Sequence, residues 1–275
     1  MGNQNIKPLS TGMRLVLLAT SGLVLLAGFQ LFVLTEQTDR YFAWTIQPPL
    51  TAAFLGAGYW AGFPLVFLAC RERSWSRARI AVPAVWLFTT LTLLATMLHL
   101  DRFHLNSADA TASFAAWFWL AIYILISPAM LVLLIRQLRM PGVDAPRQAP
   151  YPTWLRLTLS LQSAVMIGIG IGLFVAPQLV ASIWPWKLTQ LTGQAVGAWF
   201  VGVGVFTGHL AKENDFALKA GMVSFATFGL LQSLALGRYV NDLEWVKPMT
   251  WVYIAIVISV LLVSLYGLVR QTEKH

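Results

Sequence analysis

The residues best suited to chemistry in this sequence are two histidines and an aspartate that lie close together. His99, Asp101 and His104 form the pattern His-x-Asp-x-x-His. Imidazole and carboxylate groups are common protein ligands of Zn²⁺. Residues five apart on an intact helix point about 140° apart, so the two imidazoles converge only if the helix ends between them. The pattern fits two interpretations: a zinc site, to which Glu36 or Asp39 adds a ligand, or boundary histidines that bind no metal.

Three glutamines form a second set of candidate residues, because they lie inside long apolar stretches. They are Gln162, Gln194 and Gln232. A buried amide needs hydrogen-bond partners, since leaving it unpaired in apolar surroundings costs free energy. Two interpretations stay open. The amides contact a small neutral solute, or they hydrogen-bond to neighbouring helices and hold them together.

Other catalytic signatures are missing from the sequence. It contains no nucleophile elbow, no HExxH motif and no phosphate-binding loop. Its single cysteine, Cys70, excludes an internal disulfide and a metal site built from several cysteines. The sequence therefore favours a protein that is not an enzyme, and it predicts no cofactor apart from the zinc considered above.

The elements that position these residues are predicted to be membrane-spanning helices. Of the 275 residues, 57% are hydrophobic and only 11% are charged, whereas soluble domains carry about 25% charged residues. A helix needs about 20 apolar residues to cross a bilayer. The sequence predicts an all-α, polytopic membrane protein with eight spans, near residues 15–34, 51–70, 80–99, 113–135, 155–176, 191–210, 217–236 and 249–269.

The basic residues predict how these spans are oriented, because short cytoplasmic loops are enriched in Lys and Arg. With eight spans, five basic residues fall on one side: Arg40, Arg102, Lys187, Arg238 and Lys247. The other 14 of the 19, including Lys7, Arg14 and Lys274, fall on the side of both termini. Both termini are therefore predicted to be cytoplasmic. This asymmetry accounts for the net charge of +8 through membrane insertion and contact with anionic lipid, without nucleic acid.

Matching residues in the two parts of the chain predict a tandem repeat. Leu31-Phe32-Val33 recurs as Leu173-Phe174-Val175, and Trp44 corresponds to Trp186 at the same offset. Further matches pair Gly56 with Gly197 and Arg136 with Arg270, while the offset falls from 142 to 134. The predicted halves are residues 1–140 and 153–275, joined by a proline-rich cytoplasmic linker at 141–152. Four spans per half make the repeat parallel, with its axis along the membrane normal.

Small and aromatic residues add expectations about packing. Gly58-x-x-x-Gly62, Gly193-x-x-x-Gly197 and Gly204-x-x-x-Gly208 predict that helices approach one another closely. The 12 tryptophans cluster near the predicted span ends, which favours an aromatic belt at the membrane boundary for most of them.

Two segments resemble those of a known group of proteins. The stretch FAWTIQPPLTAAFLGAGYWA (Phe42–Ala61) and the pattern Trp184-Pro185-Trp186 followed by Leu188-Thr189 resemble an uncharacterised family of bacterial multi-pass membrane proteins. This resemblance implies no activity, cofactor or site. It implies location in the cytoplasmic membrane of a bacterium.

Three functions fit the sequence. The first, which the short loops and the absence of buried charge favour, is a non-catalytic accessory or structural component that contacts other membrane subunits. The second is a transporter or channel for a small neutral or hydrophobic solute. The third is an outer-face metal-dependent enzyme built on His99, Asp101 and His104.

Overall fold

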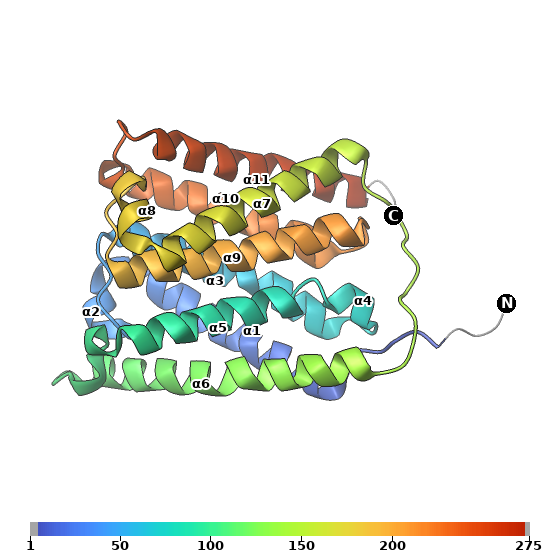
Figure 1. Cartoon of the computed structure of the whole chain (residues 1–275), viewed down its shortest axis with the longest axis horizontal. Coiled ribbons are helices and arrows are strands. Elements are labelled where there is room, and N and C mark those ends of the chain that lie inside the picture. The colour runs from blue at the N-terminus through green and yellow to red at the C-terminus, as the bar shows by residue number, and fades with distance from the viewer. Residues whose placement is uncertain (1–4, 273–275) are drawn as a thin grey trace.

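The computed structural model describes residues 5–272, which form a bundle of helices (Figure 1). Three short helices and four 3-10 turns lie between its long helices. The long helices are α1 (Thr11–Phe32), α3 (Pro49–Arg71), α5 (Val82–Leu98), α6 (Ala110–Arg139), α7 (Thr153–Val175), α9 (Gln190–Glu213), α10 (Lys219–Arg238) and α11 (Pro248–Thr272). The short elements are α2 (Thr38–Tyr41), α4 (Trp75–Ala78), α8 (Pro177–Ile183), η1 (Thr35–Gln37), η2 (Leu100–Arg102), η3 (His104–Asn106) and η4 (Val240–Asp242).

Seven of these helices are long and apolar enough to cross a membrane, so the chain is a multi-pass helical membrane protein by composition. All eight predicted spans coincide with helices to within a few residues. The exception in length is α5, which has 17 residues and a length of about 25 Å. It begins beside Pro83 and ends before His99, where the backbone leaves the helical conformation.

Local sequence explains where several of the helices begin. The hydroxyl of Ser10 accepts a hydrogen bond from the backbone N–H of Met13 at the start of α1. Asp109 accepts from the N–H groups of Thr111 and Ala112 at the start of α6. These side chains satisfy N–H groups that the first turn of a helix leaves unpaired.

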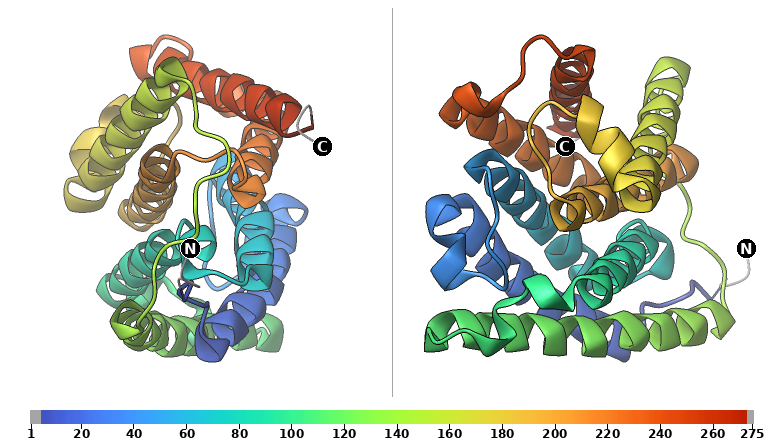
Figure 2. Two further views of the ribbon diagram at one scale, coloured as in Figure 1. Left: turned by 90° about the vertical axis from the view of Figure 1, so that its right-hand side faces the viewer. Right: turned by 60° about the vertical axis from the view of Figure 1, so that its left-hand side comes forward.

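The long helices pack in pairs that link distant parts of the chain. Helix α1 lies along α3, and α7 lies along α9, while α5 contacts α6 and α10 contacts α11. The remaining large contacts join α3 to α10 and α5 to α9. Figure 2 shows these helices from two further directions. Because α3 and α9 each contact helices from both parts of the sequence, they form the centre of the bundle.

Glycines allow the closest of these contacts, as the small-residue motifs predict. A Cβ atom at Gly56 would lie 2.5 Å from the backbone nitrogen of Phe32, and one at Gly197 would lie 2.7 Å from the carbonyl oxygen of Gly170. A Cβ atom at Gly204 would lie 3.0 Å from the backbone nitrogen of Ile167. Only residues without a side chain fit at such distances.

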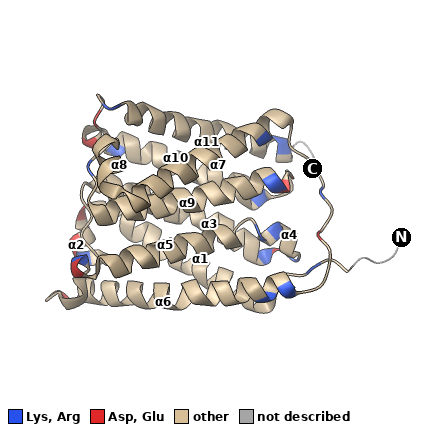
Figure 3. Ribbon diagram, viewed as in Figure 1, with Lys and Arg blue, Asp and Glu red and all other residues tan. Residues whose placement is uncertain are grey.

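The charged residues gather at the two ends of the bundle (Figure 3). Most Lys and Arg side chains lie at the end where α1 begins and α11 ends, which we call the basic end. The opposite end carries both acidic and basic residues (Figure 3), and the element bounds assign to it Arg40, Arg102, Lys187, Arg238 and Lys247. Lys274 lies outside the described residues. Within residues 5–272, the charge separation follows the predicted pattern.

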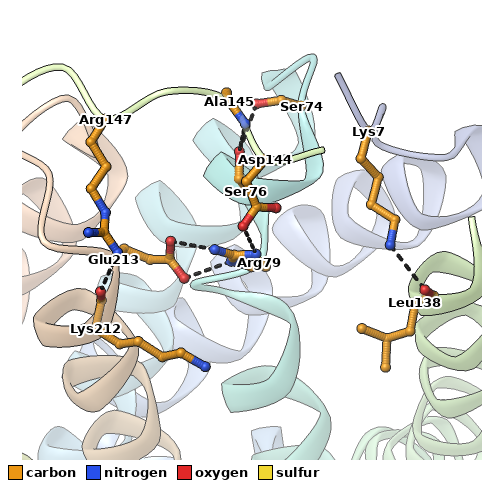
Figure 4. A network of polar contacts seen from close by, with 10 residues as sticks. All are labelled: Lys7, Ser74, Ser76, Arg79, Leu138, Asp144, Ala145, Arg147, Lys212 and Glu213. Carbon is orange, nitrogen blue, oxygen red and sulfur yellow. Dashed lines mark hydrogen bonds and ion pairs between the residues drawn. The ribbon is translucent and has the colours of Figure 1, made fainter. Parts of the chain in front are cut away.

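At the basic end, Arg79 joins three segments of the chain (Figure 4). Its Nε and Nη2 atoms donate to the two carboxylate oxygens of Glu213, at 2.6 and 2.7 Å. Its Nη1 lies 2.7 Å from Oδ2 of Asp144, in the segment between α6 and α7. These bonds hold the end of α9 and the predicted linker against the start of α5.

Three tryptophans correct the expectation of an aromatic belt. Trp44, Trp184 and Trp186 have exposed fractions of 3%, 0% and 0%, so they are core residues. Trp44 packs against Trp119 with 5.1 Å between ring centroids, and Trp186 packs against Tyr253 at 5.3 Å. The segments before α3 and before α9 fold inward over the bundle, which sequence position relative to a span does not reveal. Trp117, Trp154, Trp245 and Trp251 are exposed on the surface, where a belt residue would lie.

Candidate functional site

A cavity of about 320 Å³ lies between α1, α3, α5 and α6, with α9 and α10 closing its inner side. Ligand pockets in proteins commonly measure about 300–1,000 Å³, so the volume is that of a small-molecule site. The lining is almost wholly apolar. None of the described residues that line the cavity is Lys, Arg, Asp, Glu or His.

The cavity opens sideways, between α1 and α6. The lining residues Leu26 of α1 and Phe114 and Phe118 of α6 are exposed by 45%, 68% and 39%. Towards the basic end the two helices touch, because a Cβ atom at Gly12 would lie 2.8 Å from Leu133. At the opposite end, α2 lies against α6. The opening is therefore a window on the side of the bundle, framed by apolar residues.

The position of Trp199 determines how deep the cavity is. Its ring lies against Gly58 of α3, where a Cβ atom would come within 2.9 Å of it. One turn further, a Cβ atom at Gly62 would find its nearest neighbours at 3.9 and 4.0 Å. Both glycines line the cavity. The motif Gly58-x-x-x-Gly62 thus makes room for an indole ring at its first glycine, whereas a Cβ atom at its second glycine would meet its neighbours at ordinary contact distance.

Two buried tyrosines line the cavity and share a hydrogen bond between their hydroxyl groups. The hydroxyl oxygens of Tyr59 and Tyr123 lie 2.6 Å apart, and both side chains line the cavity. Their exposed fractions are 4% and 5%. Tyr59 lies about 15 Å along α3 from its first residue, near the middle of the helix. Thr92 of α5 lies beside Tyr123, and its hydroxyl is buried without a hydrogen-bond partner.

Most other polar side chains of the lining donate to backbone carbonyls. Thr89 donates to Trp86 at 3.0 Å, and Ser224 donates to Ala61 at 2.7 Å. The amide of Gln30 donates to the carbonyl of Tyr41 at 2.8 Å. Thr20 differs from them, because its hydroxyl oxygen is buried and has no partner within the described residues.

The other side of the bundle is filled at the corresponding depth. Phe54 of α3 stacks on Phe200 of α9, with ring centroids 5.7 Å apart and planes 11° apart. Trp186, Phe228 and Tyr253 surround this pair at centroid distances of 6.0–6.4 Å from Phe54. A space of only about 10 Å³ remains beside them.

The structure does not bring the predicted zinc ligands together. Nε2 of His99 lies 2.9 Å from Oε1 of Gln194, whereas the ring of His104 contacts the hydroxyl of Thr45 and the carbonyl of Phe42. Asp101 pairs with Arg102. Within residues 5–272, no group of three or more His, Cys, Asp and Glu side chains could hold a metal ion. The helix does end at Leu98, as a shared site requires, but the two imidazoles have separate partners.

The three candidate glutamines hydrogen-bond between segments and do not line the cavity. Nε2 of Gln162 donates to Ser259 at 2.7 Å, and Nε2 of Gln194 donates to the carbonyl of Phe174 at 3.0 Å. Gln232 joins α10 to two other helices. Its Nε2 donates to the carbonyl of Phe54, and its Oε1 accepts from the hydroxyl of Tyr253. These contacts favour the second interpretation of the glutamines, in which they hold helices together.

The residues that shape the cavity were not recognised in the sequence as site residues. Tyr59, Tyr123 and Trp199 lie in apolar stretches that contain many aromatic residues, and no spacing distinguishes them. The one signal was the motif that contains Gly58 and Gly62, which predicts close packing and says nothing of a cavity.

Comparisons with models of protein families, with curated proteins and with solved structures give no match to this chain. They identify no family. Of the resemblance drawn from Phe42–Ala61 and Trp184–Trp186, only the general part is supported, namely that the chain is a multi-pass helical membrane protein.

Proposed function

We propose that this chain is an eight-span, internally duplicated protein of a bacterial cytoplasmic membrane, which binds a small apolar molecule that enters from the bilayer. The observation that carries this proposal is the apolar cavity of about 320 Å³ with its window between α1 and α6. A pocket that opens on the lipid-facing side of a bundle is accessible to molecules dissolved in the membrane. Of the three functions that fit the sequence, this proposal corresponds to the second, a protein that acts on a small neutral or hydrophobic solute.

In the proposed topology α5 also crosses the membrane, which adds one span to the seven long helices and brings the number to eight. Its 17 residues are mostly apolar, and it packs between α6 and α9, which are both long enough to cross. With α5 crossing, all of the basic end lies on one side of the membrane. The positive-inside rule then makes that side, with both termini, cytoplasmic. Anionic lipid headgroups are the expected partners of this end.

Equivalent contacts in the two parts of the chain support the duplication. The backbone N–H of Trp75 donates to the carbonyl of Lys7, and that of Phe216 donates to Ala149, in matching positions at offsets of 141 and 142. The pairing of α1 with α3 corresponds to that of α7 with α9, and the contact of α3 with α10 corresponds to that of α9 with α5. The proposed halves are residues 1–140 and 153–275, with 141–152 as the linker.

The two halves differ where the cavity lies. The offset of 141 that pairs Gly56 with Gly197 also pairs Gly58 with Trp199 and Phe54 with Ala195. Phe54 extends from α3 into the second half and fills its interior. In α9, the small Ala195 stands at the position that corresponds to Phe54. A duplicated bundle with one filled and one open half favours ligand binding over symmetric packing alone.

The other two functions of the sequence analysis receive less support. A role as an accessory subunit stays a prediction, because the described residues identify no particular partner. A metal-dependent enzyme at His99, Asp101 and His104 also stays a prediction. The imidazoles of His99 and His104 hydrogen-bond to different residues, which does not favour a shared metal site.

Purification tests the proposed function. The full chain is extracted in mild detergent, and the molecules that remain bound are identified by mass spectrometry of an organic extract. We expect a lipid-soluble compound to be retained by the wild type and lost from Gly62→Phe, whose ring would occupy the cavity. The matched control is Gly22→Phe, at an exposed position of α1 with no atom within 4 Å of the added Cβ. Equal retention of all compounds by both variants would contradict the proposal.

A further inference from the structure

We infer that the molecule bound in the cavity is uncharged and carries a hydrogen-bond-accepting oxygen, such as a carbonyl, that meets the hydroxyl pair of Tyr59 and Tyr123. This inference rests on the proposed function and adds the chemical class of the ligand. It follows from three properties of the cavity: its charge, the number of hydroxyl hydrogens in its wall, and the way in which it opens.

The first property excludes ions as ligands. No described residue of the lining is charged, and the opening leads to an apolar surface. An ion in such surroundings would lose its hydration without gaining an opposite charge, which costs far more than any contact with the wall returns. The ligand must therefore be neutral, and most of its surface must be apolar.

The second property calls for an acceptor. The hydroxyls of Tyr59 and Tyr123 share one hydrogen bond, so only one of their two hydrogens is used between them. The hydroxyl of Thr92 beside Tyr123 does not line the cavity and is buried without a partner, so it takes up none of these hydrogens. Each hydroxyl of the pair has one hydrogen to donate, and such a pair always ends with one donor that needs an outside acceptor.

The other polar side chains of the wall differ in the hydrogens that they leave unused. Thr89 and Ser224 each donate their single hydroxyl hydrogen to a backbone carbonyl, whereas Gln30 donates one of its two amide hydrogens in this way. Thr20, with an exposed fraction of 6%, also lines the cavity and has an unpartnered hydroxyl. Buried polar groups are nearly always hydrogen-bonded, so unpaired hydroxyls in a cavity wall indicate a missing partner.

The third property fixes the route of the ligand. The window lies between α1 and α6 on the lipid-facing side, and Tyr59 lies near the middle of α3. A molecule that enters there keeps its apolar body against Phe88 and Trp199 while its oxygen reaches the tyrosine pair. Aromatic side chains provide large apolar contact surfaces for such a body.

A matched pair of compounds tests the inference. 2-Acetonaphthone and 2-ethylnaphthalene have nearly the same shape and differ by a carbonyl oxygen. Binding to the purified full chain in lipid nanodiscs is measured by equilibrium dialysis, with empty nanodiscs as the reference for partition into lipid. Because a hydrogen bond to an otherwise unpaired buried donor adds affinity, we expect the ketone to bind about three- to tenfold more tightly than the hydrocarbon.

Substitutions locate the preference. The double variant Tyr59→Phe/Tyr123→Phe keeps both rings and removes both hydroxyls, so it should abolish the preference for the ketone over 2-ethylnaphthalene. Tyr253→Phe is the control, because Tyr253 is a buried tyrosine outside the cavity. If both compounds bind equally to the wild type, or the preference survives in the double variant, the inferred acceptor is wrong while the proposed function stands. If neither compound binds, the proposed function fails as well.

Discussion

The indole ring of Trp199 in α9 lies against Gly58 in α3, so this contact joins the two parts of the chain at the centre of the bundle. A Cβ atom at position 58 would come within 2.9 Å of this ring. The contact holds the indole at the inner wall of the cavity, and the shape of the cavity therefore depends on a residue without a side chain.

Adding a methyl group at this contact should destabilise the protein. In Gly58→Ala the indole must shift, and overpacking of this kind costs about 1–3 kcal/mol. Gly168→Ala is the control, because Gly168 is exposed on α7 with no atom within 4 Å of the added Cβ. Its substitution should leave stability unchanged or raise it by up to about 1 kcal/mol. Thermal unfolding in detergent measures both, and equal midpoints would contradict the role of the contact.

A larger side chain at Gly62, which lines the cavity, should not lower the free energy of unfolding as Gly58→Ala does. In Gly62→Leu the added Cβ atom would lie 3.9 and 4.0 Å from its nearest neighbours, which is ordinary contact distance, at a position that lines the cavity. We expect the free energy of unfolding to stay the same or rise by about 1 kcal/mol, because glycine inside a helix is unfavourable. A loss of several kcal/mol in the same unfolding experiment would mean that no open space exists at Gly62.

Breaking the ion pair at the basic end should be costly. The Glu213 carboxylate has a side-chain exposed fraction of 9%, and Arg79 one of 24%. Removing one partner of a buried pair leaves an uncompensated charge and costs about 3–5 kcal/mol, and the partial exposure of Arg79 favours the lower end. We expect Arg79→Met to destabilise the protein by about 3 kcal/mol, and Arg79→Met/Glu213→Met to recover most of this loss. A double variant no more stable than the single one would contradict the pairing.

The contribution of Arg79 to the free energy of unfolding should not change between neutral and alkaline pH. Hydrogen bonds to Glu213 and then to Asp144 raise the pKa of the Arg79 guanidinium above its usual value, with burial acting in the opposite direction. A raised pKa means that the stabilisation is complete below the pKa of an arginine in the unfolded chain, which lies well above pH 10, and is lost only as the pH rises through the still higher pKa of the folded state. The difference in unfolding midpoint between the wild type and Arg79→Met should therefore stay constant from pH 7 to 10. A difference that shrinks over this range would contradict the assignment.

Cysteine labelling from each side of the membrane tests the eight-span topology. Single cysteines are placed at exposed positions in a Cys70→Ala background. Positions 73, 146 and 212 should react from the cytoplasmic side, and positions 108, 182 and 241 from the outer side. Position 108 is decisive, because it follows α5. If Ala108→Cys reacted from the same side as Arg73→Cys, α5 would not cross and the eighth span would be wrong.

The helices could be predicted from the sequence because their signal is local. An apolar stretch long enough to cross a bilayer forms a helix whatever its neighbours are, since backbone groups in lipid must pair within the segment. Helix α5 was predicted as a full span because residues 80–99 are apolar, but Ile80 and Ala81 lie in the turn before the helix. The burial of Trp44 and Trp186 was missed because it depends on how the segments before α3 and α9 fold over the bundle.

The cavity could not be predicted, because it results from packing between distant helices. Hydrophobic patterns show that Tyr59 and Phe88 lie in apolar stretches, yet they do not show which apolar position faces a neighbour and which faces empty space. The separate partners of the two candidate histidines could not be predicted for a related reason. His99 hydrogen-bonds to Gln194, which is 95 residues away and belonged to a different predicted site. Sequence proximity grouped His99 with His104, whereas the fold gave the two rings separate partners.

Photolabelling in lipid vesicles tests the central claim most directly, namely that the cavity takes up apolar molecules from the bilayer. A small uncharged hydrocarbon with a diazirine group is activated by light in vesicles that contain the full chain, and labelled residues are mapped by mass spectrometry. We predict labelling of the buried cavity residues Tyr59, Ala61 and Tyr123, which excess unlabelled hydrocarbon suppresses. Labelling of exposed residues such as Leu157 and Leu161 should persist under competition. Labels confined to exposed residues, with none on the cavity wall, would contradict the claim.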